Sequence, residues 1–261
     1  MPKKLDHTAA IAHLSNVDRK LAKIIAKAGP CRLQTENTQS IFDALMESII
    51  YQQLNGKVAA VITERVKALF PENAGRIKTR HGEAAAFPTP EQILAATPER
   101  LRSAGLSQAK MLAIRDLAAK TLDGTVPTLR AAHKMSDDEL VEHLTQVRGV
   151  GRWTVEMLLI FRLGRPDVLA VDDYGVRKGF AKMHRMDELP KPKELQAYGE
   201  RWRPHRSVAC WYMWRAAGMK DLPEPGAKAK AAAKAKKAAS KIKRLTKAKV
   251  RKAGRRMKSR S

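Results

Sequence analysis

Residues 143–180 read HLTQVRGVGRWTVEMLLIFRLGRPDVLAVDDYGVRKGF, and this stretch decides the fold of the chain. A Gly-Val-Gly turn at residues 149–151 separates two segments whose apolar residues recur at helical spacing. An apolar run at residues 168–171 follows and ends in the pair Asp172-Asp173. The pattern predicts two helices joined by a tight turn, then a buried segment that leads into a further helix.

The helix before the turn opens with Ser136-Asp137-Asp138-Glu139, a capping box that satisfies free amides at a helix start. We expect this helix to run to Gly149, whose missing Cβ permits backbone angles that are closed to other residues. The helix after the turn is expected to begin near Arg152. The two helices each bury one face, formed by Leu140, Leu144, Val147, Val155, Leu158 and Leu159.

The turn leaves bare backbone amides at a helix N-terminus, which favours the binding of an anion. The chain carries a net charge of +25, so the expected anion is a phosphate of nucleic acid. A Gly-x-Gly turn between helices is weak evidence alone, because plain helix–helix turns often contain glycine. Its meaning depends on the residues around it.

Those residues extend the turn to the longer pattern Leu144-x-x-Val147-x-Gly149-Val150-Gly151-x-x-Thr154. Asp173 follows twenty-two residues after the second glycine. The pattern resembles the helix-hairpin-helix DNA glycosylases, whose hairpin grips DNA and whose essential aspartate opens the next helix. Segments at 87–90, 105–106 and 200–214 are similar to the alkylbase branch, the 3-methyladenine DNA glycosylase II group. The resemblance covers about residues 42–218.

Alternating strand patterns are essentially absent, so the residues themselves predict an all-α protein. The resemblance implies a two-lobed helix-hairpin-helix glycosylase fold over residues 1–225. One lobe is expected at 36–130, and a second is expected to combine 1–35 with 131–224. Helices are expected at 6–28, at 41–70 with an interruption at 51–56, from Thr89-Pro90, from Thr97-Pro98, at 109–121, and at 194–217 with a break at Pro204, with a charged loop at 72–86.

Residues 226–261 form a tail rich in Ala and Lys, with sixteen Lys and Arg and no acidic residue. Of the net charge of +25, the tail supplies +16 and the rest of the chain +9. Its few large apolar residues cannot build a core, so we expect disorder until the tail meets a polyanion. Attraction to DNA without sequence preference is the expected role. A solvated tail that aids solubility is the alternative.

The resemblance implies that Asp173 is the catalytic residue, because it matches the essential aspartate of the family. A carboxylate there would stabilise the positive charge that develops on the sugar and assist a water that attacks C1′. An ordinary N-cap residue is the other interpretation of Asp173, and the two are compatible. Asp172 is adjacent and is the second candidate carboxylate.

Trp153 stands where lyase-competent relatives carry the lysine that attacks C1′. The neighbouring Arg152 cannot form a Schiff base, so the resemblance implies a monofunctional enzyme that uses water. A structural tryptophan at a helix start is the alternative. Trp153, Tyr174 and Trp214 match aromatic or pocket positions of the alkylbase branch, and ring faces attract cationic alkylated purines. Trp202, Trp211 and Tyr212 are instead expected in the core.

The polar interruption at 51–56 matches the loop from which family members insert a side chain when the target base leaves the stack. Gln53 or Leu54 is the expected plug, and a polar helix break is the alternative. Lys178 and Arg206 are further candidates for phosphate contacts or for solvated surface charges. The expected DNA-binding residues are Gly149, Gly151, Arg148, Arg152, Thr154, Gln53 and Leu54.

Together these features predict a monofunctional glycosylase that removes alkylated purines such as 3-methyladenine and 7-methylguanine from double-stranded DNA. A noncatalytic DNA-binding protein and a glycosylase for another damaged base are the alternatives. We expect a cytoplasmic, nucleoid-associated monomer without a membrane segment, cofactor or metal site in its side chains. Cys31 and Cys210 are isolated, which excludes a four-cysteine cluster. The family hairpin often holds a monovalent cation through backbone carbonyls, which side chains do not reveal.

Overall fold

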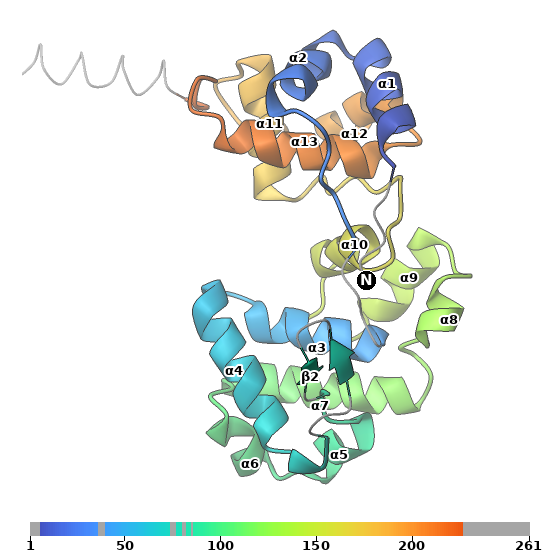
Figure 1. Ribbon diagram of the computed structural model, residues 1–261, viewed down its shortest axis with the longest axis vertical. Helices are drawn as coiled ribbons and strands as arrows, with labels where there is room; N and C mark the ends of the chain where they lie inside the picture. Colours follow the sequence, from blue (N-terminus) through green and yellow to red (C-terminus); the bar gives the residue numbers. More distant parts are fainter. Residues whose placement is uncertain (1–5, 36–39, 74–76, 80–81, 85, 227–261) are drawn as a thin grey trace, which may run out of the picture. The chain divides into compact units, whose positions relative to one another are not determined.

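In the residues that it describes, the computed structural model contains helices and one short β-hairpin, in agreement with the predicted all-α class (Figure 1). It describes residues 6–35, 40–73, 77–79, 82–84 and 86–226. The tail expected to be disordered lies outside the described residues except for its first residue, Gly226. No helix in the described part of the chain is long and apolar enough to cross a membrane.

The chain divides into two compact units. Unit 1 comprises residues 1–10, 32–170 and 203–208, and unit 2 comprises residues 11–31, 171–202 and 209–261. This division differs from the expected lobes mainly in residues 131–170, which belong to unit 1, and also in residues 1–10, 32–35 and 203–208. The reason is packing, because the helix Arg152–Phe161 contacts the helix Ile41–Tyr51 and the Arg162 guanidinium pairs with Glu47.

Unit 1 is built around α7, Gln108–Leu122, which packs against α3, Ile41–Tyr51, and against α5 and α6 (Figure 1). Both central helices bury most of their apolar residues. α4, Gly56–Ala68, packs on α3 after the polar interruption. The remaining elements of unit 1 are η1 Pro71–Asn73, β1 Ile77–Thr79, β2 Gly82–Ala84, α5 Pro90–Ala95, α6 Pro98–Ser103, α8 Leu129–Ala132, α9 Asp137–Leu144 and α10 Arg152–Phe161.

The strands β1 and β2 pair antiparallel, with Ile77 opposite Ala84 and Thr79 opposite Gly82. The expected loop at 72–86 is therefore corrected to a 3₁₀ turn followed by a hairpin. Each strand has three residues, too few for alternation of apolar and polar residues to be visible in the sequence.

Unit 2 joins the start of the chain to its C-terminal part (Figure 1). Tyr212 donates from its hydroxyl to the carbonyl of Gly29, and α2 contacts α11. Trp202 and Tyr212 are fully buried and Trp211 is buried, which confirms the predicted core aromatics. The helices are α1 Thr8–Val17, α2 Arg19–Ala28, α11 Tyr174–His184, α12 Pro192–Gly199, η2 Glu200–Trp202 and α13 Arg206–Gly218. The first three residues of α1 and of α13 belong to unit 1.

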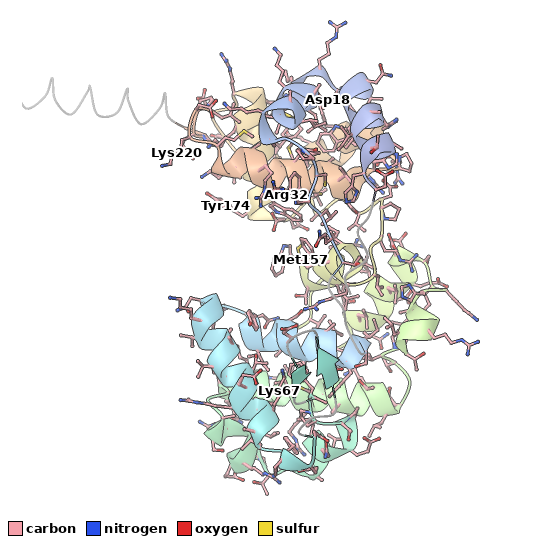
Figure 2. All side chains as sticks on the ribbon, viewed as in Figure 1. Asp18, Arg32, Lys67, Met157, Tyr174 and Lys220 are labelled. Atoms are coloured by element: carbon pink, nitrogen blue, oxygen red, sulfur yellow. The ribbon has the colours of Figure 1, made fainter. Side chains whose placement is uncertain are left out.

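The predicted single helix at 6–28 is wrong, because Asp18 divides it into α1 and α2. Asp18 is extended and caps α2 by accepting from the amides of Lys20 and Leu21 (Figure 2). Its second oxygen accepts from the Tyr198 hydroxyl and from the indole of Trp202. A buried polar cluster thus determines where the helix breaks, and Gly29 ends α2 as predicted.

Candidate active site

The predicted hairpin is present between α9 and α10. The capping box at Ser136 and Glu139 is confirmed, but α9 ends at Leu144, five residues before the expected end at Gly149. Residues 145–149 make turns in which Val147 remains buried, so the apolar periodicity continues past the end of the helix. Gly149 has φ of +76°, a conformation that an L side chain rarely adopts.

Gly151 begins α10 without a side-chain cap. The first bond back to it comes from the Val155 amide, at 3.2 Å, so the amides of the first turn have no partner within the helix. Gly151, Arg152 and Trp153 are exposed, which places these amides at the surface. The arrangement is the anion-favouring helix start that the two glycines predicted.

Asp116 on α7 fixes the position of the hairpin, because its Oδ2 accepts a hydrogen bond from the backbone amide of Arg148 at 2.7 Å. Burial raises the pKa of Asp116, but this amide and the Lys120 ammonium outweigh it and leave the pKa below its usual value. The sequence did not predict this role, because Asp116 lies thirty-two positions before Arg148 and no local pattern connects the two residues.

The side chains expected on DNA differ in their exposure. Arg148 and Arg152 are exposed, and Arg152 lies 3.8 Å from the buried Glu156 carboxylate. Thr154 is 6% exposed, so its backbone amide rather than its hydroxyl is the group near the helix start. The predicted role of Thr154 in DNA binding stays a prediction.

Two further cations, considered either as phosphate contacts or as solvated surface charges, are engaged in ion pairs. Arg206 is buried and its guanidinium binds the Asp167 carboxylate at 2.8 Å, so this residue is internal and the expectation is wrong. Lys178 pairs with Glu224 at 3.0 Å, and that hydrogen bond raises the pKa of the lysine.

Asp173 is the N-cap of α11. Its Oδ1 accepts from the Val176 amide at 2.7 Å and from the Trp214 indole Nε1 at 2.8 Å. The carboxylate is therefore held by α11 and by α13, and the side chain is half-buried. Asp172 is exposed beside it. The geometry distinguishes the two acids, because only Asp173 among them is fixed by both helices in the hydrogen bonds above.

Two glycines in α11 make the approach of Trp214 to Asp173 possible. A Cβ on Gly179 would lie 1.9 Å from the Met213 carbonyl oxygen, and one on Gly175 would lie 2.7 Å from Cδ1 of Trp214. Backbone contact between α11 and α13 at Gly179 brings the indole onto the start of α11. Sequence reasoning missed both glycines, although their spacing of four residues places them on one helix face.

The three candidate pocket aromatics are at or near the surface. Tyr174 is 66% exposed and projects from α11 away from the helices of unit 2 (Figure 2). Trp214 is half-buried, so unit 2 brings Asp173, Tyr174 and Trp214 together. Trp153 is 47% exposed at the start of α10 in unit 1. The exposed rings of Tyr174 and Trp153 leave both residues accessible to a ligand, and their pocket role stays a prediction.

The candidate plug residues lie in the break between α3 and α4. Gln53 is exposed with φ of +57°, and Leu54 is 37% exposed. The loop brings Gln53 and Leu54 to the surface of unit 1. Insertion of either side chain into DNA stays a prediction.

No group of three or more metal-binding side chains occurs in the described part of the chain. A hairpin cation would be bound by backbone carbonyls, and two of them already accept hydrogen bonds. The Val147 carbonyl accepts from the Val150 amide at 3.0 Å, and the Gly149 carbonyl accepts from Gln52 at 2.9 Å. A carbonyl has two lone pairs, so these bonds are compatible with a cation but do not require one.

Comparison with known proteins gives concordant matches. The DNA-3-methyladenine glycosylase 1 of Schizosaccharomyces pombe is 35% identical over 84% of this chain and 91% of its own length. A solved structure of that organism's 3-methyladenine DNA glycosylase with abasic DNA has a TM-score of 0.68, with 34% identity over 83% of this chain and all of that one. A DNA-3-methyladenine glycosidase of Bacillus halodurans has a TM-score of 0.68 and 31% identity over 84% of this chain and 93% of that one.

The family described as HhH-GPD superfamily base excision DNA repair protein matches residues 46–204, which include the hairpin, Asp173 and the loop between α3 and α4. The chain belongs to the HhH-GPD superfamily of base excision DNA repair proteins.

Proposed function

We propose that this chain is a monofunctional DNA-3-methyladenine glycosylase that removes alkylated purines from double-stranded DNA in base excision repair. Relatives at 30% identity or more carry this activity in their names, and one of them is solved on abasic DNA. The observation that carries the proposal is the fixed carboxylate of Asp173, which accepts from the Val176 amide and the Trp214 indole. A protein that only bound DNA would not need this acid to be held by two helices.

The reaction breaks the bond between C1′ and the base nitrogen, and the base leaves with the electron pair. Positive charge develops on the sugar, and the Asp173 carboxylate stabilises it. A water then forms the new C1′–O bond and passes its proton to the same carboxylate. The N-cap position at the start of α11 favours a negative charge there, which suits both tasks.

The product should be an intact abasic site. Trp153 occupies the position of the lyase lysine, and neither it nor Arg152 can form a Schiff base with C1′. Water is therefore the nucleophile. The wide, exposed ring of Trp153 instead suits contact with a base or with the sugar beside it.

Base selection is assigned to Trp153, Tyr174 and Trp214. Alkylation at N3 or N7 makes a purine cationic, and aromatic ring faces attract a cation by about 0.5–2 kcal/mol. The same positive charge weakens the glycosidic bond, so an undamaged purine that entered the site would react slowly. Binding and bond strength then select together for 3-methyladenine and 7-methylguanine.

The hairpin binds the backbone of the duplex. Exposed amides at Gly151 and Arg152, with the Arg148 side chain nearby, suit a backbone phosphate. Gln53 or Leu54 fills the stack when the target base leaves it. The chain acts as a DNA-associated monomer, and the cytoplasmic nucleoid is where it would meet its substrate.

The test is to incubate the protein with methylated duplex DNA and to identify the released bases by chromatography. Release of 3-methyladenine or 7-methylguanine, with strands that break only after alkali, is the expected result. Strand cleavage without alkali, or trapping of a covalent adduct by borohydride, would show a lyase. Tight binding without release of any base, including deaminated and oxidised ones, would favour a noncatalytic DNA-binding protein.

A further inference from the structure

A side-chain amide joins the two loops of unit 1 that were assigned to DNA. Gln52 Nε2 donates to the Gly149 carbonyl at 2.9 Å, across ninety-seven residues of sequence. Gln52 immediately precedes the plug candidates Gln53 and Leu54, and Gly149 is the first glycine of the hairpin. The bond therefore ties the plug loop, residues 52–55, directly to the hairpin.

The backbone of the plug loop is fixed at the same residue. The Lys110 ammonium donates to the carbonyls of Ile50 and Gln52, at 2.7 and 2.8 Å. These carbonyls end α3, so a cation also complements the negative end of that helix. The ammonium is partly buried at these carbonyls, and this burial lowers the pKa of Lys110.

α7 carries the anchors of both loops. Lys110 in its first turn holds the plug loop, and Asp116 further along holds the Arg148 amide of the hairpin. The Gln52 side chain then links the two loops directly to each other. The hairpin and the plug loop are thus parts of one rigid frame rather than independent loops.

We propose that Gln52 is a positioning residue that keeps the plug loop in register with the hairpin, so that a phosphate held by the hairpin places Gln53 and Leu54 at the base stack. The inference rests on the proposed function, in which the hairpin holds DNA and the loop inserts into it. Gln52 acts through its neighbours and needs no contact with the reacting atoms. Its loss should affect extrusion of the base more than binding or bond cleavage.

The test replaces Gln52 by methionine, which keeps the length of the side chain and removes the donor. Gln196→Met is the matched control, because Gln196 also donates its amide to a neighbour, the Glu200 carboxylate, but lies on α12 in unit 2. Single-turnover release is measured from duplexes with one 7-methylguanine, paired either with cytosine or with an abasic site. A 2-aminopurine next to the lesion reports unstacking by fluorescence.

We expect Gln52→Met to release the paired base about fivefold more slowly, a loss of the size of one neutral hydrogen bond. The rise in 2-aminopurine fluorescence should decrease in the same variant. Its rate of release of the unpaired base and its affinity for undamaged duplex should stay within about twofold of wild type, and its melting temperature should be unchanged. Gln196→Met should match wild type in every readout. An equal loss on paired and unpaired substrates, or no loss on either, would overturn the proposal.

Failure of the proposed function would look different. If wild type released no base from either duplex, the glycosylase assignment would fail. The positioning role of Gln52 would then be tested by the rise in 2-aminopurine fluorescence alone. A rise in wild type that is unchanged in Gln52→Met would then overturn the positioning role as well.

Discussion

In the proposed reaction, Asp173 combines a backbone role and a chemical role in one side chain. The same oxygen that caps α11 also accepts from the Trp214 indole, so the carboxylate is oriented before any substrate arrives. Preorganised groups of this kind stabilise charge in a transition state without having to rearrange. The cap interpretation and the catalytic interpretation of Asp173 therefore support one another.

Trp214→Phe tests this orientation at the level of a single hydrogen bond. Phenylalanine keeps an aromatic ring and removes the indole donor that binds Asp173 Oδ1. We expect the single-turnover rate of base release to fall about tenfold, equivalent to about 1.4 kcal/mol. Affinity for DNA with an abasic site should change less than threefold. A rate equal to that of wild type would show that the indole does not position the carboxylate.

Sequence reasoning identified Asp173 and Trp214 separately but not the bond between them. The N-cap position follows from local pattern, because a short acidic side chain before a helix has a defined role. The partner lies forty-one residues away, and only the packing of α11 on α13 shows that the indole reaches the acid. Asp116 was missed for the same reason.

At the scale of elements, the crossing of α11 and α13 controls the site. Gly179 costs the isolated helix about 1 kcal/mol relative to alanine, yet it allows the two backbones to touch. The structure therefore accepts a weaker helix in exchange for a closer contact. That contact determines where Trp214 can lie.

Gly179→Ala should destabilise the protein by about 1–3 kcal/mol, because the added methyl group overlaps the Met213 carbonyl. Urea unfolding measures the change in free energy. Gly218→Ala is the matched control, since a Cβ there meets no atom within 4 Å. Equal stability of the two variants would contradict the backbone contact described here.

Elements with local signals were predicted well. The caps at Thr89 and Thr97, each followed by proline, start α5 and α6 as expected. The short helix α8 was missed, because four residues are too few for periodicity to appear. The break at Asp18 was missed because its partners Tyr198 and Trp202 come from the far end of the chain.

At the scale of the whole molecule, His184 gives stability a pH dependence. Burial first, and then the charge of Lys20, lower its pKa from 6.5 to about 4. The nearby Asp18 carboxylate acts in the opposite direction and Arg201 in the same one. The folded state thus holds a neutral imidazole that stacks on Phe180 and accepts from the Lys20 ammonium.

This depressed pKa makes folding more favourable above pH 6.5 than below it. The unfolded chain takes up a proton as pH falls through 6.5, whereas the folded chain resists until about pH 4. We therefore expect the melting temperature to fall between pH 6.5 and 4, and the fall to be smaller in His184→Gln. Identical pH profiles of the two proteins would show that His184 does not contribute.

The basic tail should act on DNA binding rather than on chemistry. A variant with the sixteen Lys and Arg of residues 226–261 replaced by glutamine keeps the chain length and removes the charge. The plot of log affinity against log salt concentration on undamaged duplex has a negative slope. Each lost phosphate contact should reduce the magnitude of that slope by about 0.9. The single-turnover rate at saturating enzyme should remain that of wild type. An unchanged salt slope would assign the tail no part in DNA binding.

In the proposed reaction, hydrolysis of the glycosidic bond depends on the Asp173 carboxylate. The most direct test is the single-turnover rate of base release by Asp173→Asn from a duplex with one methylated purine. Asparagine retains an oxygen that can accept from the Val176 amide and the Trp214 indole, so the fold should persist. We expect a rate at least about 100-fold lower with DNA affinity retained. A rate within about threefold of wild type would contradict the account and would transfer the role to Asp172 or another group.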